Sequence, residues 1–565
     1  MLHIDSLLLE AFYNENKDFF INARIQKIQQ PTRREVILQL RNKTETRKLY
    51  ININPDFYHL CFMNKENEIR RNIEIPKQPP MFCMLLRKHM EGARILNISK
   101  PDFERIIELT FENYNELGDR IEECLSIELM GKHSNIVLYN TDNNIIIGCA
   151  HNIGAEKSKE RELAGGLPYI YPPKQNKKNL LQTRYDWFLS ALKKSEDSLK
   201  KTISERYFSL SQAVVEELCI KTNISPELPA KNIQEKDSQL LFVTLHEFLD
   251  NKEKIYTIDK NYSKFSCLAK LGRQYTSINE LIDDYFSYNI EKTFVNNLKT
   301  NLKTKINKEL KKLRNTYQNQ QKQIDKKDKA KLYMTKGNLL TANAYQIQSG
   351  EKSVMLKDYE TDSMIEIALD ENLSPIENAK RYFDLYNKNK KAYLIAQEMI
   401  INTEEEIKYL QQLLYDIDVS NNISELKDIL TEIEPQTQMQ NNKTKNKKEE
   451  TINITKENID GFIVYIGKNS KQNDYLYSKI SSPNDLWFHT LNTPGSHVIL
   501  KAQKNQAQIP DNVILKTAKL AKEYSTAKNS TKVPVVYTMR KYIKRPNNTK
   551  AGFVVYKNET EIVAD

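Results

Sequence analysis

The spacing of hydrophobic residues changes several times along the 565-residue chain. From residue 1 to about 175, apolar and polar residues alternate in short runs, at residues 23–28, 35–40, 48–53, 105–111, 125–129 and 134–139. This period of two is typical of strands with one buried face. Helices are expected over residues 6–16 and 81–90; Pro79 and Pro80 precede the second, and Gly92 follows it. We therefore predict an α+β domain over residues 1–175.

Residues 176–290 show helical spacing and little else, for example over residues 210–220 and 240–249, and we expect a helical domain there. Two later stretches carry apolar residues at steps of three or four, the pattern of a coiled coil. They comprise Val295, Leu298, Leu302, Ile306, Leu310, Leu313 and Tyr317, and then Ile400, Thr403, Ile407, Leu410, Leu414 and Ile417.

The insert between these stretches, residues 332–375, contains β-patterned runs at 353–356 and 364–367. Two heptad helices on either side of an insert predict an antiparallel coiled-coil arm over residues 291–432 with a small β-containing cap. Residues 433–457 are polar and low in complexity, which predicts a flexible linker. Residues 458–565 alternate short strands with turns around one helix, residues 514–524. The predicted fold class is multidomain α+β, because the chain is too long for a single core.

The net charge of +11 is concentrated in two blocks. Residues 292–331 carry 13 Lys and Arg against three acids, and residues 516–557 carry 11 against one, so each block has a charge of +10. The remainder is about −9, which is 11 minus 20. Two separated basic blocks favour binding of an extended polyanion at two places. A basic coiled-coil face that is only solvated remains the alternative interpretation.

Several classes of function have no motif in the chain. The six cysteines (61, 83, 124, 149, 219 and 267) form no CxxC pair and no metal-ligand spacing with histidine, so we expect reduced thiols and no metal. There is no Walker loop, GxGxxG or nucleophile elbow, and we expect neither a cofactor nor catalytic residues. No run of 18 apolar residues occurs, and residues 1–5 are no signal peptide, which predicts a cytoplasmic protein without a membrane partner.

The densest group of candidate residues lies between residues 485 and 500, in a strand–turn–strand pattern with a Pro-Gly turn. Trp487 and Phe488 are apolar there, and Asp485, His489, Ser496 and His497 are polar. Histidine beside aromatic residues near a basic surface suits stacking and hydrogen bonding to nucleic acid. The alternative is a buried strand pair whose histidines are satisfied core donors.

This run, with residues 467–474 and 541–546, resembles the C-terminal RNA-associated module of the NFACT family of ribosome quality-control factors. Residues 79–89 and 128–135 resemble the family's N-terminal domain, and the resemblance extends over essentially the whole chain. The resemblance implies RNA-associated residues in the C-terminal module, namely Lys468, Asn469, Asn473, Asp485, Trp487, His489, Gly495, Ser496, His497, Arg540, Lys541, Lys544 and Arg545.

The resemblance also implies an N-terminal fold similar to that of formamidopyrimidine DNA glycosylases. Those enzymes use an N-terminal proline followed by a glutamate, whereas Leu2 and His3 occupy these places here, which argues against base excision. For residues 176–290 the family implies helix-hairpin-helix-like elements, although the sequence shows no clear glycine-bearing hairpin.

In the family, an Asp-Arg pair of the N-terminal domain is required for engaging tRNA. Glu104 and Arg105 stand at the matching positions, with Lys132 and His133 as further candidates for tRNA binding. The arginine can make a bidentate contact to phosphate or a base edge, whereas glutamate lengthens the reach of the carboxylate by one methylene.

The implied partners are the large ribosomal subunit, its peptidyl-tRNA and an aminoacyl-tRNA (alanyl-tRNA in bacteria), with the protein monomeric on the ribosome. The implied role is recruitment of that tRNA for template-free alanine tailing of the stalled peptide. The reaction belongs to ribosomal RNA, so the protein is expected to bind and position rather than to catalyse. Two alternatives come from other classes: a surface fibronectin-binding adhesin, which the missing export signal disfavours, and a nucleic-acid-processing enzyme of the glycosylase type.

Overall fold

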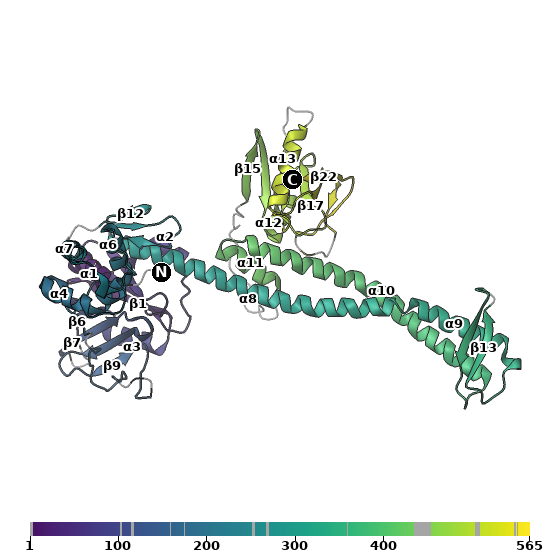
Figure 1. Ribbon diagram of the computed structural model, residues 1–565, viewed down its shortest axis with the longest axis horizontal. Helices are drawn as coiled ribbons and strands as arrows, with labels where there is room; N and C mark the ends of the chain where they lie inside the picture. The colour runs from purple at the N-terminus through teal and green to yellow at the C-terminus, as the bar shows by residue number, and fades with distance from the viewer. Residues whose placement is uncertain are drawn as a thin grey trace. The chain divides into compact units, whose positions relative to one another are not determined.

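The chain forms a multidomain α+β protein, as its sequence predicts, with two compact units at residues 1–293 and 294–565 (Figure 1). In the computed structural model the described residues are 4–101, 104–114, 118–156, 158, 160–173, 176–250, 255–266, 270–358, 360–433, 454–502, 509–546, 550 and 552–565. The predicted linker falls largely outside them, since α11 ends at Ile433 and β15 begins at Thr455.

The first unit is built on a nine-stranded sheet with the order β4-β3-β2-β1-β5-β6-β7-β8-β9, in which all neighbours are antiparallel. A single residue pair, Arg24 with Arg94, joins β1 to β5. The strands are β1 (Arg24–Thr32), β2 (Glu35–Arg41), β3 (Thr46–Asn52), β4 (His59–Met63), β5 (Arg94–Ser99), β6 (Ile106–Tyr114), β7 (Arg120–Glu128), β8 (Asn135–Asn140) and β9 (Ile146–Cys149).

Helices bury the apolar face of this sheet. They are α1 (Ser6–Phe20) and α3 (Met81–Met90), whereas α2 (Lys65–Arg70) buries the polar Asn67. Leu9 and Phe12 of α1 and Leu86 of α3 share one core with residues of both halves of the sheet. The first turns of α8 (Ile278–Ile324) contribute Leu281 and Phe286 to the same core. The N-terminal domain therefore supplies the hydrophobic environment in which the longest helix of the chain begins.

A buried polar network fixes α2 to the start of α8. Arg71, just after α2, donates to the Asp283 carboxylate, and both side chains are 1% exposed. Asn67 donates to Asp283 at 2.9 Å and to Asp284 at 2.7 Å. A buried charge pair adds little net stability against an apolar pair, but removal of one partner leaves an uncompensated charge. This network therefore makes the packing of α8 specific.

A helical domain follows the sheet in the first unit. It contains α4 (Tyr185–Lys193), α5 (Leu199–Arg206), α6 (Gln212–Lys221) and α7 (Glu235–Asp250), with 3-10 turns at Leu180–Gln182 and Ala230–Asn232. The expectation of helices and little else was incomplete. A three-stranded sheet, β11-β10-β12, follows α7 with β10 at Tyr256–Ile258, β11 at Phe265–Ser266 and β12 at Arg273–Tyr275. Strands of two or three residues are too short to display a period of two.

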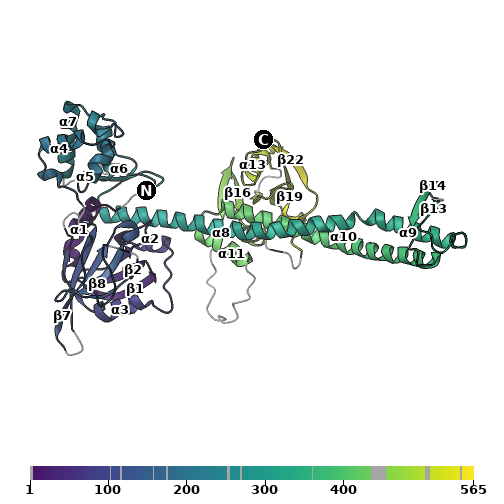
Figure 2. The ribbon, with the colours of Figure 1, turned by 60° about the horizontal axis from the view of Figure 1, so that its bottom comes forward.

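The second unit contains the arm. α8 lies against α10 (Pro375–Val419) and α11 (Ile423–Ile433), and their apolar residues form one core (Figures 1 and 2). The heptad residues Leu302, Ile306 and Ile417 are buried there, as the pattern predicts, and Leu413 is buried beside them. α8 begins at Ile278, so the expected domain boundary at residue 290 lies inside a continuous helix.

The cap of the arm contains a helix as well as the expected strands. α9 (Lys327–Ala342) pairs with α10, and Leu339 and Leu340 near its end share one core with Leu356 and Ile367 of the two strands that follow. The two expected strands are present as β13 (Ser353–Asp358) and β14 (Ser363–Ala368), which form an antiparallel hairpin. Ser374 and Glu377 form a capping box at the start of α10, which sharply defines where the return helix begins.

The C-terminal domain is a six-stranded antiparallel sheet in the order β15-β16-β18-β17-β19-β22. One core lies against α13 (Asp511–Glu523), and a second surrounds Leu476 and Trp487. The remaining elements are β15 (Thr455–Ile459), β16 (Phe462–Gly467), α12 (Ser470–Tyr475), a π-helical turn (Leu476–Ile480), β17 (Leu486–Thr490), β18 (His497–Leu500), β19 (Val533–Met539), a 3-10 turn (Arg540–Tyr542), β20 (Ile543–Lys544), β21 (Val555–Tyr556) and β22 (Thr560–Ala564).

We predict that Asp283→Ala destabilises the packing of α8 on the N-terminal domain by about 3–5 kcal/mol, because it leaves the Arg71 charge buried without its partner. Hydrogen exchange in increasing urea, read in peptides covering α2 and residues 278–287, measures this loss. Asp186→Ala removes the exposed partner of Arg184 and is the matched control, with an expected change below about 1 kcal/mol. Equal effects of the two substitutions would contradict the assignment.

Candidate nucleic-acid interface

Strand pairing brings the candidate residues of the N-terminal domain to one end of the sheet. Ile106 at the start of β6 pairs with Glu128 at the end of β7. Residues that precede β6 therefore lie beside residues that follow β7, and the Leu129 N–H donates to the Arg105 carbonyl at 2.8 Å. The segment after β7 leads into a 3-10 turn at Gly131–His133, where Lys132 and His133 are exposed.

Tyr58 lies near both segments, the one before β6 and the one after β7. The Arg105 guanidinium donates to the Tyr58 hydroxyl at 3.4 Å. Gly131 has φ +63°, and a Cβ there would lie 3.8 Å from the Tyr58 ring. Glu104 is half-buried beside Arg105. The structure thus places Glu104 and Arg105 at the same end of the sheet as Lys132 and His133, within one domain.

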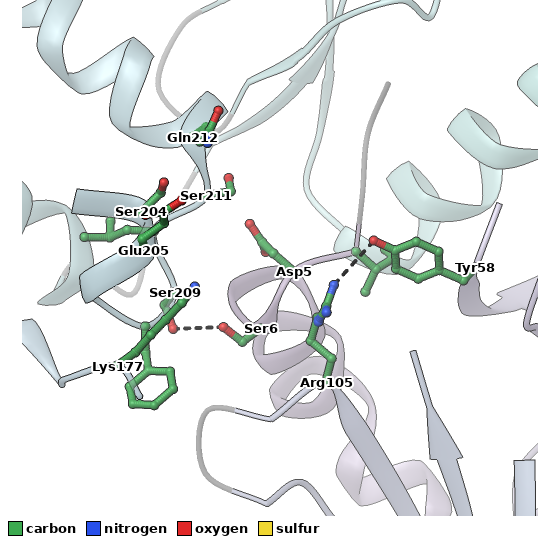
Figure 3. A pocket seen from close by; sticks show the side chains of 13 residues that line it. Asp5, Ser6, Tyr58, Arg105, Lys177, Ser204, Glu205, Ser209, Ser211 and Gln212 are labelled. Atoms are coloured by element: carbon green, nitrogen blue, oxygen red, sulfur yellow. Dashed lines mark hydrogen bonds between the residues drawn. The ribbon is translucent and has the colours of Figure 1, made fainter. Parts of the chain in front are cut away.

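Arg105 lines a cavity of about 420 Å³ between the end of the sheet and the helical domain (Figure 3). Asp5, Tyr58 and Lys177 line it as well, together with Ser211 and other residues of the segment that joins α5 to α6. Figure 3 shows the Arg105 side chain between Asp5 and Tyr58. Charged and hydroxyl-bearing side chains therefore converge on a space large enough for a small polar group.

The charges in this cavity influence one another. Asp5 caps α1 by accepting from the Leu8 N–H at 3.0 Å. Desolvation raises the pKa of Asp5, while the Ser211 hydroxyl and Arg105 act in the opposite direction. Desolvation lowers the pKa of Lys177, and the nearby Arg105 lowers it further. Asp5 and Glu205, which line the cavity as well, have the opposite effect on Lys177, so the cavity brings two cations and two carboxylates together.

The turn between α5 and α6 holds one residue in the left-handed conformation. Ser209 adopts φ +62°, a conformation for which glycine is the usual residue, and its hydroxyl lies 3.3 Å from the Ser6 hydroxyl. The turn and the start of α6 line the cavity. Serine thus takes the left-handed position in the turn between two helices that pack together, and the helix-hairpin-helix-like elements stay a prediction.

Sequence reasoning missed several residues of this cavity. Asp5 had a detectable signal, since a residue with an N-cap side chain directly precedes an amphipathic helix. Tyr58, Lys177 and Ser211 had none, because they reach the cavity from three separate segments. Only the packing of the helical domain on the sheet reveals them.

The aromatic residues of the C-terminal motif are buried. Trp487 is 3% exposed and His497 is 6% exposed, and the His497 ring lies edge-on at 5.2 Å from Trp487. The His489 ring stacks on Trp487 with centroids 5.7 Å apart. Burial lowers the pKa of both histidines, that of His497 by the larger amount. These facts favour the buried strand pair over direct stacking on nucleic acid for Trp487 and His497.

Other motif residues hold the domain together. Asp485 is buried and accepts from Lys501 Nζ at 2.6 Å and from the Ala502 N–H at 2.9 Å. Asn469 caps α12, and Asn473 accepts from the His497 N–H at 3.2 Å. Arg540 donates to the Tyr477 carbonyl at 3.0 Å. Their side chains are therefore engaged within the protein in this structure.

A basic edge remains on the domain surface, formed by Lys541, Tyr542, Lys544 and Arg545. Lys541, Lys544 and Arg545 are exposed, and Tyr542 is 37% exposed. The Lys541 ammonium lies 5.1 Å from the centre of the Tyr542 ring, and Arg545 donates to Asp474. Cations beside an accessible aromatic ring are the combination that binds single-stranded nucleic acid.

No group of three or more histidine, cysteine or acidic side chains among the described residues could hold a metal ion. None of their helices has both the length and the apolar character needed to cross a membrane.

These features define a multidomain α+β protein with two candidate nucleic-acid surfaces, one on the N-terminal cavity and one on the C-terminal domain. Residues 5–451 match the profile of the NFACT N-terminal and middle domains, and residues 452–558 match that of the NFACT protein RNA binding domain. The chain belongs to the NFACT family.

Full-length relatives are similar to this chain. It is 30% identical over 575 residues to the Rqc2 homolog RqcH of Bacillus subtilis, covering 99% of this chain and 97% of that protein. It is 29% identical to the Rqc2 homolog RqcH of Streptococcus suis, with the same coverage. The solved N-terminal part of the fibronectin/fibrinogen-binding protein from Streptococcus suis aligns with 50% of this chain and 98% of its own, at 26% identity and a TM-score of 0.40. At that score the likeness carries no argument about function.

We predict that the C-terminal domain loses stability as the pH falls from 7 to 5. The pKa of His497 lies well below its ordinary value of 6.5, so the unfolded chain binds the proton first and gains stability below pH 6.5. The expected slope is up to about 1.4 kcal/mol per pH unit for one histidine. His497→Gln removes this contribution. Unfolding followed by Trp487 fluorescence in a Trp187→Phe background measures both slopes, and identical slopes would refute the prediction.

Proposed function

We propose that this chain is a ribosome quality-control factor that binds the large ribosomal subunit carrying a stalled peptidyl-tRNA. It recruits alanyl-tRNA there, and template-free elongation adds an alanine tail that marks the peptide for degradation. The correspondence of nearly the whole chain to the two NFACT domains carries this proposal. We also propose that the N-terminal domain has a fold similar to that of DNA glycosylases but does not catalyse base excision.

The cavity around Arg105 is the proposed contact with tRNA. A guanidinium presents a planar fork of donors, which fits two oxygens of a phosphate or two acceptors of a base edge. Lys177 adds a second cation, and exposed Lys132 and His133 extend the surface along the same end of the sheet. In this proposal Glu104 orients Arg105 or accepts a hydrogen bond from a base.

Ribosomal RNA is the proposed partner of the two basic blocks. The first lies on α8 and the start of α9, and the second includes α13 and the basic edge. Clustered Lys and Arg release counterions from RNA, which supplies affinity without sequence specificity. Peptide-bond formation belongs to the ribosome, so the protein contributes binding and positioning.

We expect the protein to co-sediment with free large subunits that carry nascent peptide, and not with intact ribosomes. Because the proposed contacts are largely to phosphate, binding weakens steeply with salt, by about one log-log slope unit for each neutralised phosphate. Lys541→Ala combined with Lys544→Ala lowers that slope by about two units. A flat salt response, or exclusive association with small subunits, would argue against the proposal.

Arg105→Ala is expected to abolish tRNA recovery and alanine tailing while large-subunit binding persists. Arg105→Lys keeps the charge but loses the fork, so it rescues tailing only weakly. Glu104→Gln impairs tailing, and Glu104→Asp leaves it nearly unchanged. Tailing is measured in cells lacking the wild-type protein.

The matched control is Arg120→Ala, which removes an exposed arginine at the opposite end of β7. It is expected to leave tailing intact. If Arg105→Ala and Glu104→Gln were both harmless, the tRNA site would have to lie elsewhere. Protease shaving of intact cells separates this function from that of a surface adhesin, since we expect the chain to stay uncleaved.

A further inference from the structure

The arm and the C-terminal domain meet through a paired set of hydrogen bonds. The Gln412 side chain, on α10, donates from Nε2 to the Gly495 carbonyl at 3.0 Å. Its Oε1 accepts from the Gly495 N–H at 3.0 Å. The side-chain amide thus pairs with the backbone of the loop between β17 and β18 as another peptide group would.

Asp416, one helical turn further along α10, reaches a second loop. Its carboxylate accepts from the Ser470 N–H at 3.0 Å and from the Ser470 hydroxyl at 3.1 Å, at the first residue of α12. It also accepts from Gln412 Nε2 at 2.8 Å. Asp416 is 0% exposed, so its desolvation is offset by these donors rather than by water.

Two further contacts lie beside Gln412 and Asp416. Lys471 forms an ion pair with Asp428 of α11 at 2.8 Å. The Lys550 ammonium lies 3.8 Å from the centre of the Tyr409 ring, which is one turn before Gln412 on α10. The contact therefore combines a buried polar centre with an ion pair and a cation–aromatic contact beside it.

The loop of Gly495 has no room for a side chain. A Cβ at Gly495 would lie 3.0 Å from Ser525 Cβ and 3.0 Å from Thr490 Oγ1. A side chain at this position would therefore crowd the C-terminal domain itself, and with glycine the backbone N–H and carbonyl are the groups that pair with Gln412. Residues 467–474 and 493–497 belong to the motifs singled out in the sequence as RNA-associated, yet Ser470, Lys471 and Gly495 among them contact the arm.

We propose that these two loops form an intramolecular docking surface that holds the C-terminal domain on α10 and α11 as a releasable latch. The latch consists of Gln412 and Asp416 on the arm, with Ser470 and Gly495 on the domain. It leaves the basic edge of the same domain available for RNA. Its partner is the chain's own arm, and its test uses no RNA, so its outcome does not depend on the proposed function.

The charge state of Asp416 adds a pH response to the latch. Burial raises the pKa of Asp416 to about 7, with the Glu432 carboxylate of α11 acting in the same direction and the Gln412 and Ser470 donors acting against it. Lys471 from α12 and Asp428 from α11 are the charged residues of the adjoining ion pair. Because docking raises the pKa above the ordinary value of 3.8, the docked form takes up a proton. Docking is therefore stronger at pH 6 than at pH 8.

Hydrogen exchange of the full-length chain tests the latch, because Ser470 and Gly495 donate their own amide protons to it. Gln412→Ala combined with Asp416→Ala is expected to speed exchange at least tenfold in peptides covering residues 468–474 and 493–497. Peptides of β17 and β19 keep their protection, which shows that the domain remains folded. Asp418→Ala is the matched control, since this exposed residue of α10 pairs with Lys303 of α8.

Wild-type protection in both loop peptides after the double substitution would overturn the proposal. Loss of protection in β17 and β19 to the same extent would also overturn it, because the contact would then be part of the domain's core. In a pH series corrected for intrinsic exchange, loop protection is expected to decrease from pH 6 to pH 8 in the wild type and to stay constant in Asp416→Asn. An increase over this range would contradict the role given to the Asp416 proton.

Discussion

The apolar seam shared by α8, α10 and α11 is the interaction on which the second unit depends. A 47-residue helix with many lysines on its surface gains little from propensity alone, and burial of an apolar stripe must hold it. Leu302 and Ile306 of α8 bury against Leu413 and Ile417 of α10. Once α10 is fixed, its start supports the cap and its end presents Gln412 and Asp416 to the C-terminal domain.

In the first unit, the register of the strand pairing determines where the candidate binding residues lie. Pairing of Ile106 with Glu128 places Arg105 beside the turn that carries Lys132 and His133, and a slip of one residue would turn these side chains to opposite faces. The buried Arg71–Asp283 pair ties the same domain to α8. The proposed binding residues thus lie on loops at the end of a sheet that serves as their scaffold.

The sequence predicted those elements whose signals are local. The helix at 81–90 follows from the two prolines and the glycine around it, and the heptads predicted the paired helices. The helix over residues 332–342 was not predicted, because the β-patterned runs that follow it were the clear signal within the insert. The role of Asp416 could not be predicted, since a carboxylate next to a heptad position is ordinarily solvated. Similarly, the motif around Trp487 indicated a nucleic-acid-binding site, whereas in the folded domain side chains such as Trp487 and His497 are buried.

Sequencing of RNA crosslinked to the native protein, combined with mapping of the crosslinked peptides, tests the ribosome quality-control role most directly. The predicted result is large-subunit ribosomal RNA on peptides of α8 or the basic edge, and a narrow set of tRNAs on peptides around Arg105. Recovery of small-subunit or messenger RNA alone, or the absence of tRNA from peptides of the first unit, would contradict it.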